Sequence, residues 1–219
     1  MNKKAISVKN DSILMTSILT ADNVNSRKTQ DVSWLINSIK KILNMYEASP
    51  KTWGIYRRYS FQLEINSCEN ALLTALQIKS ALKSTENIDV RIGIGIGKKE
   101  FSTSKITEYD GEAFINSGFA FDNYHKKQHL AIKTPWKKVD EELNIAFDLV
   151  LLTINSWTQN SAEIFKLSLE NKDATQKEIS KILGISQSSV SERQKRAGFE
   201  PIMKLEKHFR KLIQQKIQV

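Results

Sequence analysis

Apolar and polar residues recur with two different periods along the chain, and the change between them separates an N-terminal part from a C-terminal part. In the N-terminal part, apolar runs at 12–22 and 89–97 follow the pattern of strands. Residues 32–46 instead place apolar side chains three and four positions apart, which is typical of an amphipathic helix. After residue 136 the helical spacing continues to the end of the chain.

The elements predicted before residue 136 follow the order β-α-β-β-α-β. This is the succession of a ferredoxin-like domain, an antiparallel sheet with helices on one face. A further helix (111–125) and a strand (129–134) are expected to extend it. The six predicted elements lie at 12–22, 32–46, 53–65 (two strands around a tight bend), 68–82 and 89–97.

The stretch from Thr175 to Phe199 predicts two short helices joined by a glycine turn. Apolar residues at helical spacing end at Gly184, which adopts a left-handed turn conformation without strain. Ser186 is then a good N-cap for the second helix, and residues 161–170 would form a supporting helix before the pair. A helical hairpin that binds protein or RNA is the alternative. The spacing that resembles the bacterial helix-turn-helix family is carried by Ile179, Leu183, Gly184, Ile185 and Val190.

In the helix-turn-helix family, the second helix enters the major groove of DNA by its N-terminal half. The sequence departs from the family pattern one turn after Val190, where Arg193 and Gln194 replace an apolar residue and leave Ala197 and Phe199 to close the core. Since Val190 faces inward, the other side of this helix is expected to read bases, and neighbouring cations are expected to reach phosphates. The expected DNA-binding residues are Lys181, Ser186, Gln187, Ser188, Ser191, Glu192, Arg193, Lys195 and Arg196.

Two more helices complete the expected architecture. A long helix from Lys137 through Trp157 lies in a stretch without Pro or Gly, which predicts a stiff connector. Residues 201–217 carry an apolar stripe that either covers the helix-turn-helix or pairs with a second copy of the chain. The sequence thus predicts an α+β fold with a ferredoxin-like domain (1–136), a connector helix (137–160), and an all-α helix-turn-helix domain with a C-terminal helix (161–219).

Charge supports a nucleic-acid partner for the C-terminal part. The 219 residues include 33 Lys and Arg against 24 Asp and Glu, a net charge of +9. Residues 172–219 contain eleven basic and five acidic residues. The net positive charge of this segment is two thirds of the net charge of the whole chain. Such a balance favours nucleic acid over a membrane. No apolar run approaches the ~18 residues of a spanning helix, and the single cysteine, Cys68, indicates a reducing, cytoplasmic compartment.

Three glycines alternate with isoleucines in the last predicted strand of the ferredoxin-like part. The isoleucines would fill the core face, and Gly93, Gly95 and Gly97 would leave bare backbone on the other face. We therefore expect a ligand or a second copy of the chain to approach this face. A dinucleotide-binding fingerprint is excluded, because Lys98 stands where it requires glycine and no helix is predicted to begin there.

Five segments, taken in their order and spacing, resemble the SatD family of bacterial proteins, and the resemblance covers nearly the whole chain. It implies a domain similar to class III nucleotidyl cyclases followed by a helix-turn-helix. The segments are TADNVNSRK (20–28), YSFQ (59–62), RIGIGIG (91–97), DGEAFINSGFAFD (110–122) and SQSSVSERQKRAGF (186–199).

Cyclase-like domains hold metal ions with two aspartates, one at the end of the first strand and one on the bend between the second and third strands. Asp22 fits the first position, where a cap or loop hydrogen bond is its alternative role. Tyr59 occupies the second position, which implies a domain that does not catalyse. No metal or cofactor is therefore expected, and Mg²⁺ would be needed only by an active site. Ser26 and Arg27 join Asp22 and the three glycines as candidate ligand-binding residues.

Together these patterns predict a bacterial DNA-binding transcriptional regulator that acts as a homodimer. Its helix-turn-helix would read DNA, and its cyclase-like domain would dimerise or would sense a nucleotide or another small-molecule effector. The alternative is a nucleotidyl cyclase-like phosphotransferase that is regulated by its C-terminal domain. Neither of these two functions requires a membrane partner, and for both the protein is expected in the cytoplasm.

Overall fold

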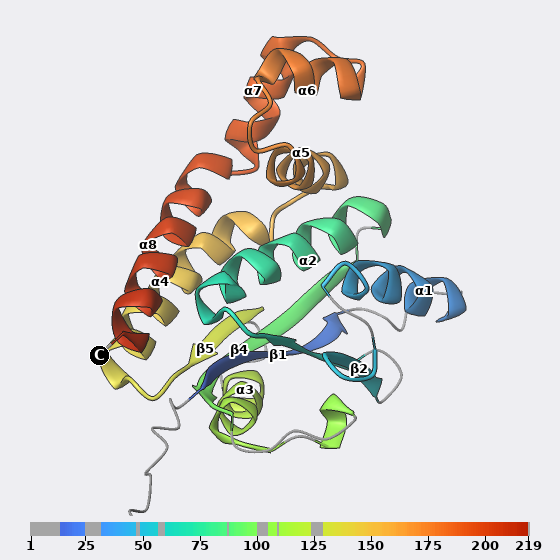
Figure 1. Cartoon of the computed structure of the whole chain (residues 1–219). Coiled ribbons are helices and arrows are strands. Elements are labelled where there is room, and N and C mark those ends of the chain that lie inside the picture. Colours follow the sequence, from blue (N-terminus) through green and yellow to red (C-terminus); the bar gives the residue numbers. More distant parts are fainter. Residues whose placement is uncertain are drawn as a thin grey trace, which may run out of the picture.

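The computed structural model describes residues 14–24, 32–46, 49–56, 60–86, 88–99, 105–108, 110–123 and 129–218. It confirms the α+β class, with an N-terminal sheet and a C-terminal helical region (Figure 1). The elements are β1 (Met15–Val24), α1 (Val32–Leu43), β2 (Trp53–Tyr56), β3 (Ser60–Ile65), the 3₁₀ helix η2 (Cys68–Asn70), α2 (Ala71–Glu86), β4 (Asp89–Lys98), the 3₁₀ helix η3 (Ile106–Glu108), α3 (Glu112–Asn123), β5 (Leu130–Lys133), α4 (Lys137–Ile154), α5 (Gln159–Glu170), α6 (Gln176–Leu183), α7 (Gln187–Arg196) and α8 (Phe199–Ile217).

The sheet has the strand order β2-β3-β1-β4-β5. All neighbouring strands are antiparallel except β4 and β5, which are parallel. The central strands β1 and β4 pair from Met15 opposite Lys98 to Val24 opposite Asp89. From β1 to β4 the elements follow the β-α-β-β-α-β succession predicted from the sequence.

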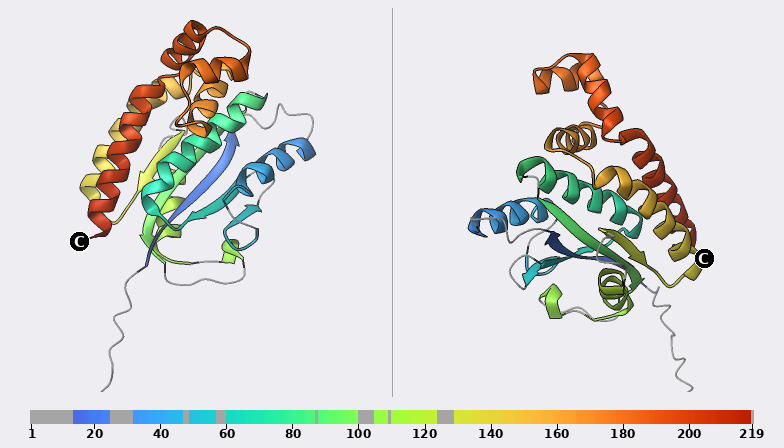
Figure 2. Two further views of the ribbon diagram at one scale, coloured as in Figure 1. Left: turned by 45° about the horizontal axis from the view of Figure 1, so that its top comes forward. Right: turned by 180° about the vertical axis from the view of Figure 1, so that it is seen from behind.

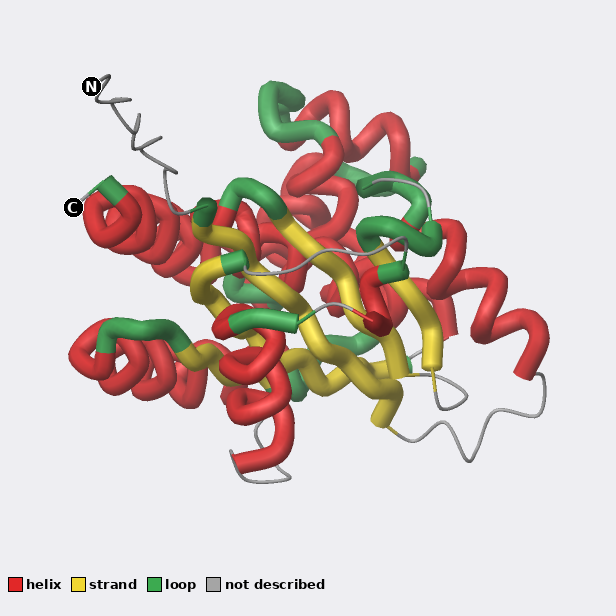
Figure 3. Tube along the Cα trace, turned by 60° about the horizontal axis from the view of Figure 1, so that its bottom comes forward, coloured by secondary structure: helices red, strands yellow, loops and turns green. Residues whose placement is uncertain are grey.

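Helices cover both faces of the sheet, whereas the sequence predicted helices on one face. In Figure 1, α1 and α2 lie above the sheet and α3 lies below it, and Figure 3 views the sheet from the α3 side. The buried isoleucines of β4 belong to the main core with residues of α1 and α2, as expected from their alternation. A second helical layer was not predicted, because the helical pattern of residues 111–125 does not indicate which face it covers.

The glycine face of β4 is not bare, so the expectation of an open surface there was wrong. A Cβ atom added to Gly95 would lie 2.1 Å from the backbone nitrogen of Ser117, and one added to Gly93 would lie 2.6 Å from that of Phe121. At Gly97 it would lie 2.6 Å from the nitrogen of Ala113. The glycines are therefore needed because α3 of the same chain packs directly on the strand backbone.

The outer edge of β5 is covered by a side chain of α4. Asn144 accepts a hydrogen bond from the backbone nitrogen of Ile132 at 3.0 Å and donates one to its carbonyl oxygen at 2.9 Å. One amide side chain therefore supplies the acceptor and donor that a further strand would supply. Covering the edge in this way hinders another chain from pairing with it.

The helix that was predicted as a connector belongs to the packed body. It ends at Ile154 rather than Trp157, and its inner side joins the main core. Phe147 of α4 stacks on Phe209 of α8 with 6.5 Å between ring centroids. Phe209 and Ile213 of α8 are buried within the chain, and α8 packs against α4, α2 and η2 as well as α7. The expectation that this helix covers the helix-turn-helix is therefore only partly correct, because most of its inner side covers the sheet part.

A buried charge cluster ties α2 to the starts of β4 and β5. Lys79 is fully buried and donates hydrogen bonds to Asp89 at 2.8 Å and to the carbonyl oxygen of Val90 at 2.6 Å. Burial lowers the pKa of Lys79. Burial would raise the pKa of Asp89, but the hydrogen bond with His129 and the charge of Lys79 hold that pKa below its ordinary value. Each buried charge thus has a partner, as burial requires.

We expect opposite effects from alanine at Gly95, which faces α3, and at Gly118, which lies within α3. Gly95→Ala should destabilise the protein by about 3 kcal/mol, because its Cβ would meet the backbone of α3. Gly118→Ala should stabilise it by about 0.5–1 kcal/mol, because Gly118 lies inside α3 with open space around its Cα. Urea denaturation measures both, and equal effects would contradict the close approach of α3 to β4.

Candidate nucleic-acid interface

The glycine turn and both of its flanking helices form as the sequence predicted. Thr175 and Glu178 make a capping box at the start of α6, in which the Glu178 carboxylate accepts from the Thr175 backbone nitrogen at 2.7 Å. Gly184 ends α6 in the left-handed conformation, with φ of 65°. Ser186 caps α7 by accepting a hydrogen bond from the backbone nitrogen of Ser189 at 3.1 Å.

A small aromatic core holds these helices against α5. Val190 of α7 points inward and is fully buried, as predicted. Trp157 donates from its indole nitrogen to the carbonyl oxygen of Ala197 at 2.9 Å, and its ring lies 4.6 Å from that of Phe165. Phe165 in turn meets Phe199 edge-on at 5.2 Å. This core fixes the C-terminal end of α7 to the turn between α4 and α5.

Gln194 is a structural residue that the sequence analysis did not identify. Its amide oxygen accepts from Gln176 of α6 at 2.9 Å, and its amide nitrogen donates to Ser168 of α5 at 2.8 Å. The side chain therefore bridges all three helices from the position where the family pattern usually has an apolar residue. The absence of an apolar residue there was the available signal, because a polar group on an inner face needs partners.

The predicted DNA-binding residues fall into two groups in the structure. Arg193 is largely covered and lies 3.8 Å from Glu163 of α5, and the Ser186 hydroxyl is engaged in capping. These two residues hold the motif together. The other seven predicted residues are solvent-exposed on α6 and α7: Lys181, Gln187, Ser188, Ser191, Glu192, Lys195 and Arg196.

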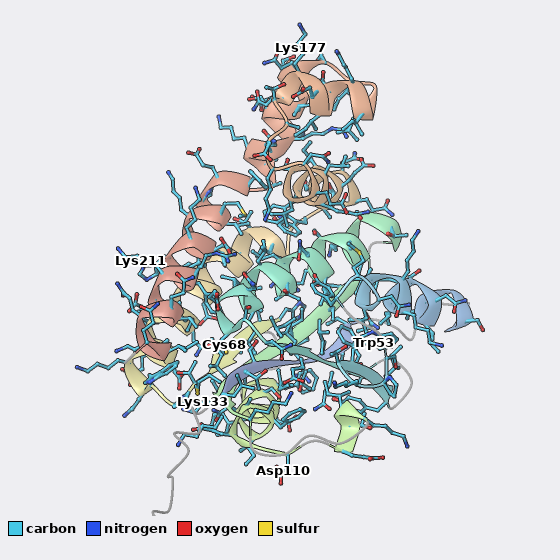
Figure 4. The ribbon with its side chains drawn as sticks, viewed as in Figure 1. Trp53, Cys68, Asp110, Lys133, Lys177 and Lys211 are labelled. Carbon is cyan, nitrogen blue, oxygen red and sulfur yellow. The ribbon has the colours of Figure 1, made fainter. Side chains whose placement is uncertain are left out.

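The exposed side of α7 lies at the end of the molecule farthest from the sheet. Figure 1 shows α6 and α7 projecting beyond α5, and both views in Figure 2 agree. Lys177 of α6 marks this tip in Figure 4. Apart from the buried Val190, the N-terminal half of α7 is polar and uncharged up to Ser191, and the basic residues of α7 lie in its last turn. A helix start with free N–H groups and small side chains can approach a phosphate backbone closely.

One residue of α6 departs from the expected burial. Ile182 follows Ile179 at helical spacing, as an inward residue would, but 57% of its surface is exposed. The helix has only eight residues, and its inner side is supplied by the buried Ile179 and the partly buried Leu183. Spacing of three or four residues alone could not distinguish Ile182 from Leu183.

The N-terminal candidates do not form a comparable site in the described part of the chain. Asp22 is partly buried on β1 and stands opposite Arg91 of β4, whose guanidinium lies 3.9 Å from the centre of the Phe121 ring. Ser26 and Arg27 lie outside the described residues, as does Tyr59. The three glycines lie under α3. No group of three or more His, Cys, Asp or Glu residues able to hold a metal is found among the described residues.

Acid should weaken the capping box of α6. Two hydrogen bonds from Thr175 lower the pKa of Glu178, so the carboxylate's contribution to stability is present above the ordinary pKa of about 4.3. It is lost as the pH falls through the lowered value. Wild-type protein should therefore melt at a higher temperature than Glu178→Gln at pH 7, and the difference should shrink as the pH falls below the ordinary pKa. Thermal unfolding followed by circular dichroism measures it, and a constant difference would contradict the role of the carboxylate.

Comparison with known protein families gives a match within this helical region. Residues 154–198 match the family model described as Sigma-70, region 4. The matched segment spans α5, α6 and α7. Searches of curated proteins and of solved structures gave no match. None of the helices described is long and apolar enough to cross a membrane. The match does not reach the N-terminal sheet, so the SatD and cyclase-like expectations remain predictions, whereas the C-terminal part of the chain is a DNA-binding helix-turn-helix.

Proposed function

We propose that this protein is a bacterial transcriptional regulator that reads DNA with α7. The observation that carries the proposal is the coincidence of the Sigma-70 region 4 match with a helix-turn-helix whose recognition side is open to solvent. In such motifs the second helix lies in the major groove. The net positive charge of the C-terminal part supplies the sequence-independent share of the affinity.

The residues of α7 suit different parts of the DNA. Gln187 at the start of the helix can pair its amide with both the acceptor and the donor of adenine. Ser188 and Ser191 are small and allow the helix backbone to approach the base edges. Lys195 and Arg196 lie farther along, where the helix leaves the groove and phosphates are within reach. Glu192 suits the amino group of cytosine, and Lys181 of α6 suits a phosphate.

The N-terminal sheet would serve as the regulatory part of this cytoplasmic protein. Its β-α-β-β-α-β succession and the order β2-β3-β1-β4 support a ferredoxin-like unit of the kind that the SatD resemblance implies. The resemblance also implies that this unit does not catalyse, since Tyr59 stands in place of the second metal-binding aspartate. Regulation then requires contact between the sheet part and the helix-turn-helix, and such contact exists between α2 and α5.

A homodimer would allow two helix-turn-helix units to bind two half-sites on the DNA. A single trihelical unit buries little DNA surface, and helix-turn-helix dimers place two recognition helices about 34 Å apart. The exposed side of α4 carries an apolar stripe, in which Ile145, Leu149 and Leu152 are 64%, 64% and 76% exposed. Their spacing of four and three residues aligns them along the helix, which suits pairing with the same stripe of a second copy.

DNA binding should depend on salt and on two residues of α7 in different ways. Lys195→Ala should weaken binding to all sequences and reduce the slope of log affinity against log salt by about 0.9, because one phosphate contact is lost. Gln187→Ala should cost about 1–3 kcal/mol on a DNA site obtained by in vitro selection and much less on random DNA.

Fluorescence anisotropy at several salt concentrations measures both effects. Lys211→Ala is the matched control for charge, because Lys211 is an exposed lysine on α8, away from the tip (Figure 4). DNA affinity of the wild-type protein that does not change with salt, or equal losses of affinity for Lys195→Ala and Lys211→Ala, would contradict the proposal that this side of α7 binds DNA.

Self-association should depend on the stripe of α4. Leu149→Glu should give a monomer, because two carboxylates would be buried against each other without partners. Ile115→Glu is the matched control, since Ile115 of α3 is 68% exposed but lies on the other side of the sheet. Sedimentation velocity measures the two variants and the wild type. A wild-type monomer, or a dimer that survives Leu149→Glu, would contradict the proposed interface.

A further inference from the structure

A cavity lies between the sheet part and the helix-turn-helix part of the molecule. Its volume is about 530 Å³, which is within the range of small-molecule sites. Three helices line it: α1 and α2 from the sheet part, and α5 from the segment that matches Sigma-70 region 4. Figure 1 shows α2 between α1 and α5, and the left view of Figure 2 agrees.

The walls of the cavity are mainly apolar, with a few polar groups. Ile42, Ala81 and Leu169 provide apolar surface from the three helices. Tyr46 donates a hydrogen bond to the side-chain oxygen of Gln77 at 2.8 Å, and burial raises the pKa of Tyr46 to about 12, so its hydroxyl stays protonated. A mainly apolar cavity with a small number of fixed polar groups is the usual form of a small-molecule site.

The charges at the cavity favour a ligand with one negative charge. Lys166 and Glu170 of α5 lie 3.8 Å apart and largely neutralise each other. Lys41 of α1 also lines the cavity, and within the described part of the chain no carboxylate lies within salt-bridge distance of it. The cavity therefore carries one unmatched positive charge beside its apolar wall, which complements an amphipathic anion.

The position of α5 connects this cavity to the recognition helix. Lys166, Leu169 and Glu170 face the cavity, and Ser168 between them holds Gln194 of α7. Glu163, one turn earlier, is 3.8 Å from Arg193 of α7. A ligand that displaces α5 relative to α2 would thus move the helix that positions α7. The ligand would then contact the two arrangements of α5 differently, and coupling between two sites requires such a difference.

We propose that this cavity binds an amphipathic small molecule with an apolar body and one carboxylate, and that binding there alters DNA affinity through α5. The Lys41 ammonium faces the carboxylate, and the apolar body lies against Ile42, Ala81 and Leu169. The second half of the proposal rests on the DNA-binding function proposed above, and the first half does not.

The site is tested with 2-naphthoate, and 2-naphthamide is its neutral counterpart. Isothermal titration calorimetry on the full chain should show saturable binding of the naphthoate and about fivefold weaker binding of the amide. Lys41→Gln should weaken naphthoate binding to the level of the amide, whereas Lys40→Gln, next to it but outside the cavity lining, should not. Ala81→Phe should abolish binding of both compounds by filling the cavity.

Any of three results would contradict the proposed binding site: no naphthoate binding by the wild-type protein, equal affinity for the two compounds, or unchanged naphthoate binding by Lys41→Gln. Lys41 is exposed on α1, so its substitution does not endanger folding even where Ala81→Phe does. Because calorimetry requires no DNA, these results are independent of the proposed function.

The coupling is tested with the selected DNA site. Saturating 2-naphthoate should change the DNA affinity of the wild-type protein by about fivefold and leave that of Ala81→Phe unchanged. Naphthoate binding without any change in DNA affinity would contradict the proposed coupling but not the proposed binding site. Absence of DNA binding by the wild-type protein before naphthoate is added would instead contradict the proposed function.

Discussion

The antiparallel pairing of β1 with β4 is the constraint on which the rest of the structure depends. The ten residue pairs between β1 and β4 fix the register of the two central strands, so the isoleucines and glycines of β4 lie on opposite faces along its length. The isoleucine face needs a layer of apolar side chains, which α1 and α2 provide. The glycine face allows a helix backbone to approach so closely that no side chain fits between, and α3 occupies that position.

The position of α2 then determines where the DNA-binding unit sits. The buried ion pair of Lys79 and Asp89 fixes α2 to the end of the central strand, in addition to the apolar contacts on its inner side. On its outer side α2 packs against α5, and Gln159 of α5 donates a hydrogen bond to the carbonyl oxygen of Thr85 at 3.2 Å. The helix-turn-helix is therefore attached to the sheet through α2 rather than suspended from a connector. Such an attachment lets a change at the α2–α5 junction reach α7.

Polar side chains complete this framework at the places where backbone or charge would otherwise lack a partner. Asn144 pairs with the edge of β5, and Gln194 joins three short helices whose apolar contacts are few. At the far end of α8, Arg210 bonds both Glu206 of its own helix and Asn70 of η2. In each case a buried or half-buried polar group is hydrogen-bonded, so that it adds specificity without the cost of an unsatisfied group.

Local rules determined much of this protein from its sequence alone. The helix-turn-helix was predictable because its determinants lie within 25 residues: a glycine that accepts a left-handed turn, a serine that caps the next helix, and Val190 at the spacing of an inner face. The order of strands and helices was predictable for the same reason. Only the tertiary structure decided what covers the glycine face, that Arg193 turns to Glu163, and that α1, α2 and α5 line a common cavity. These features depend on contacts between residues far apart in the chain, and periodicity within one element does not specify its neighbour.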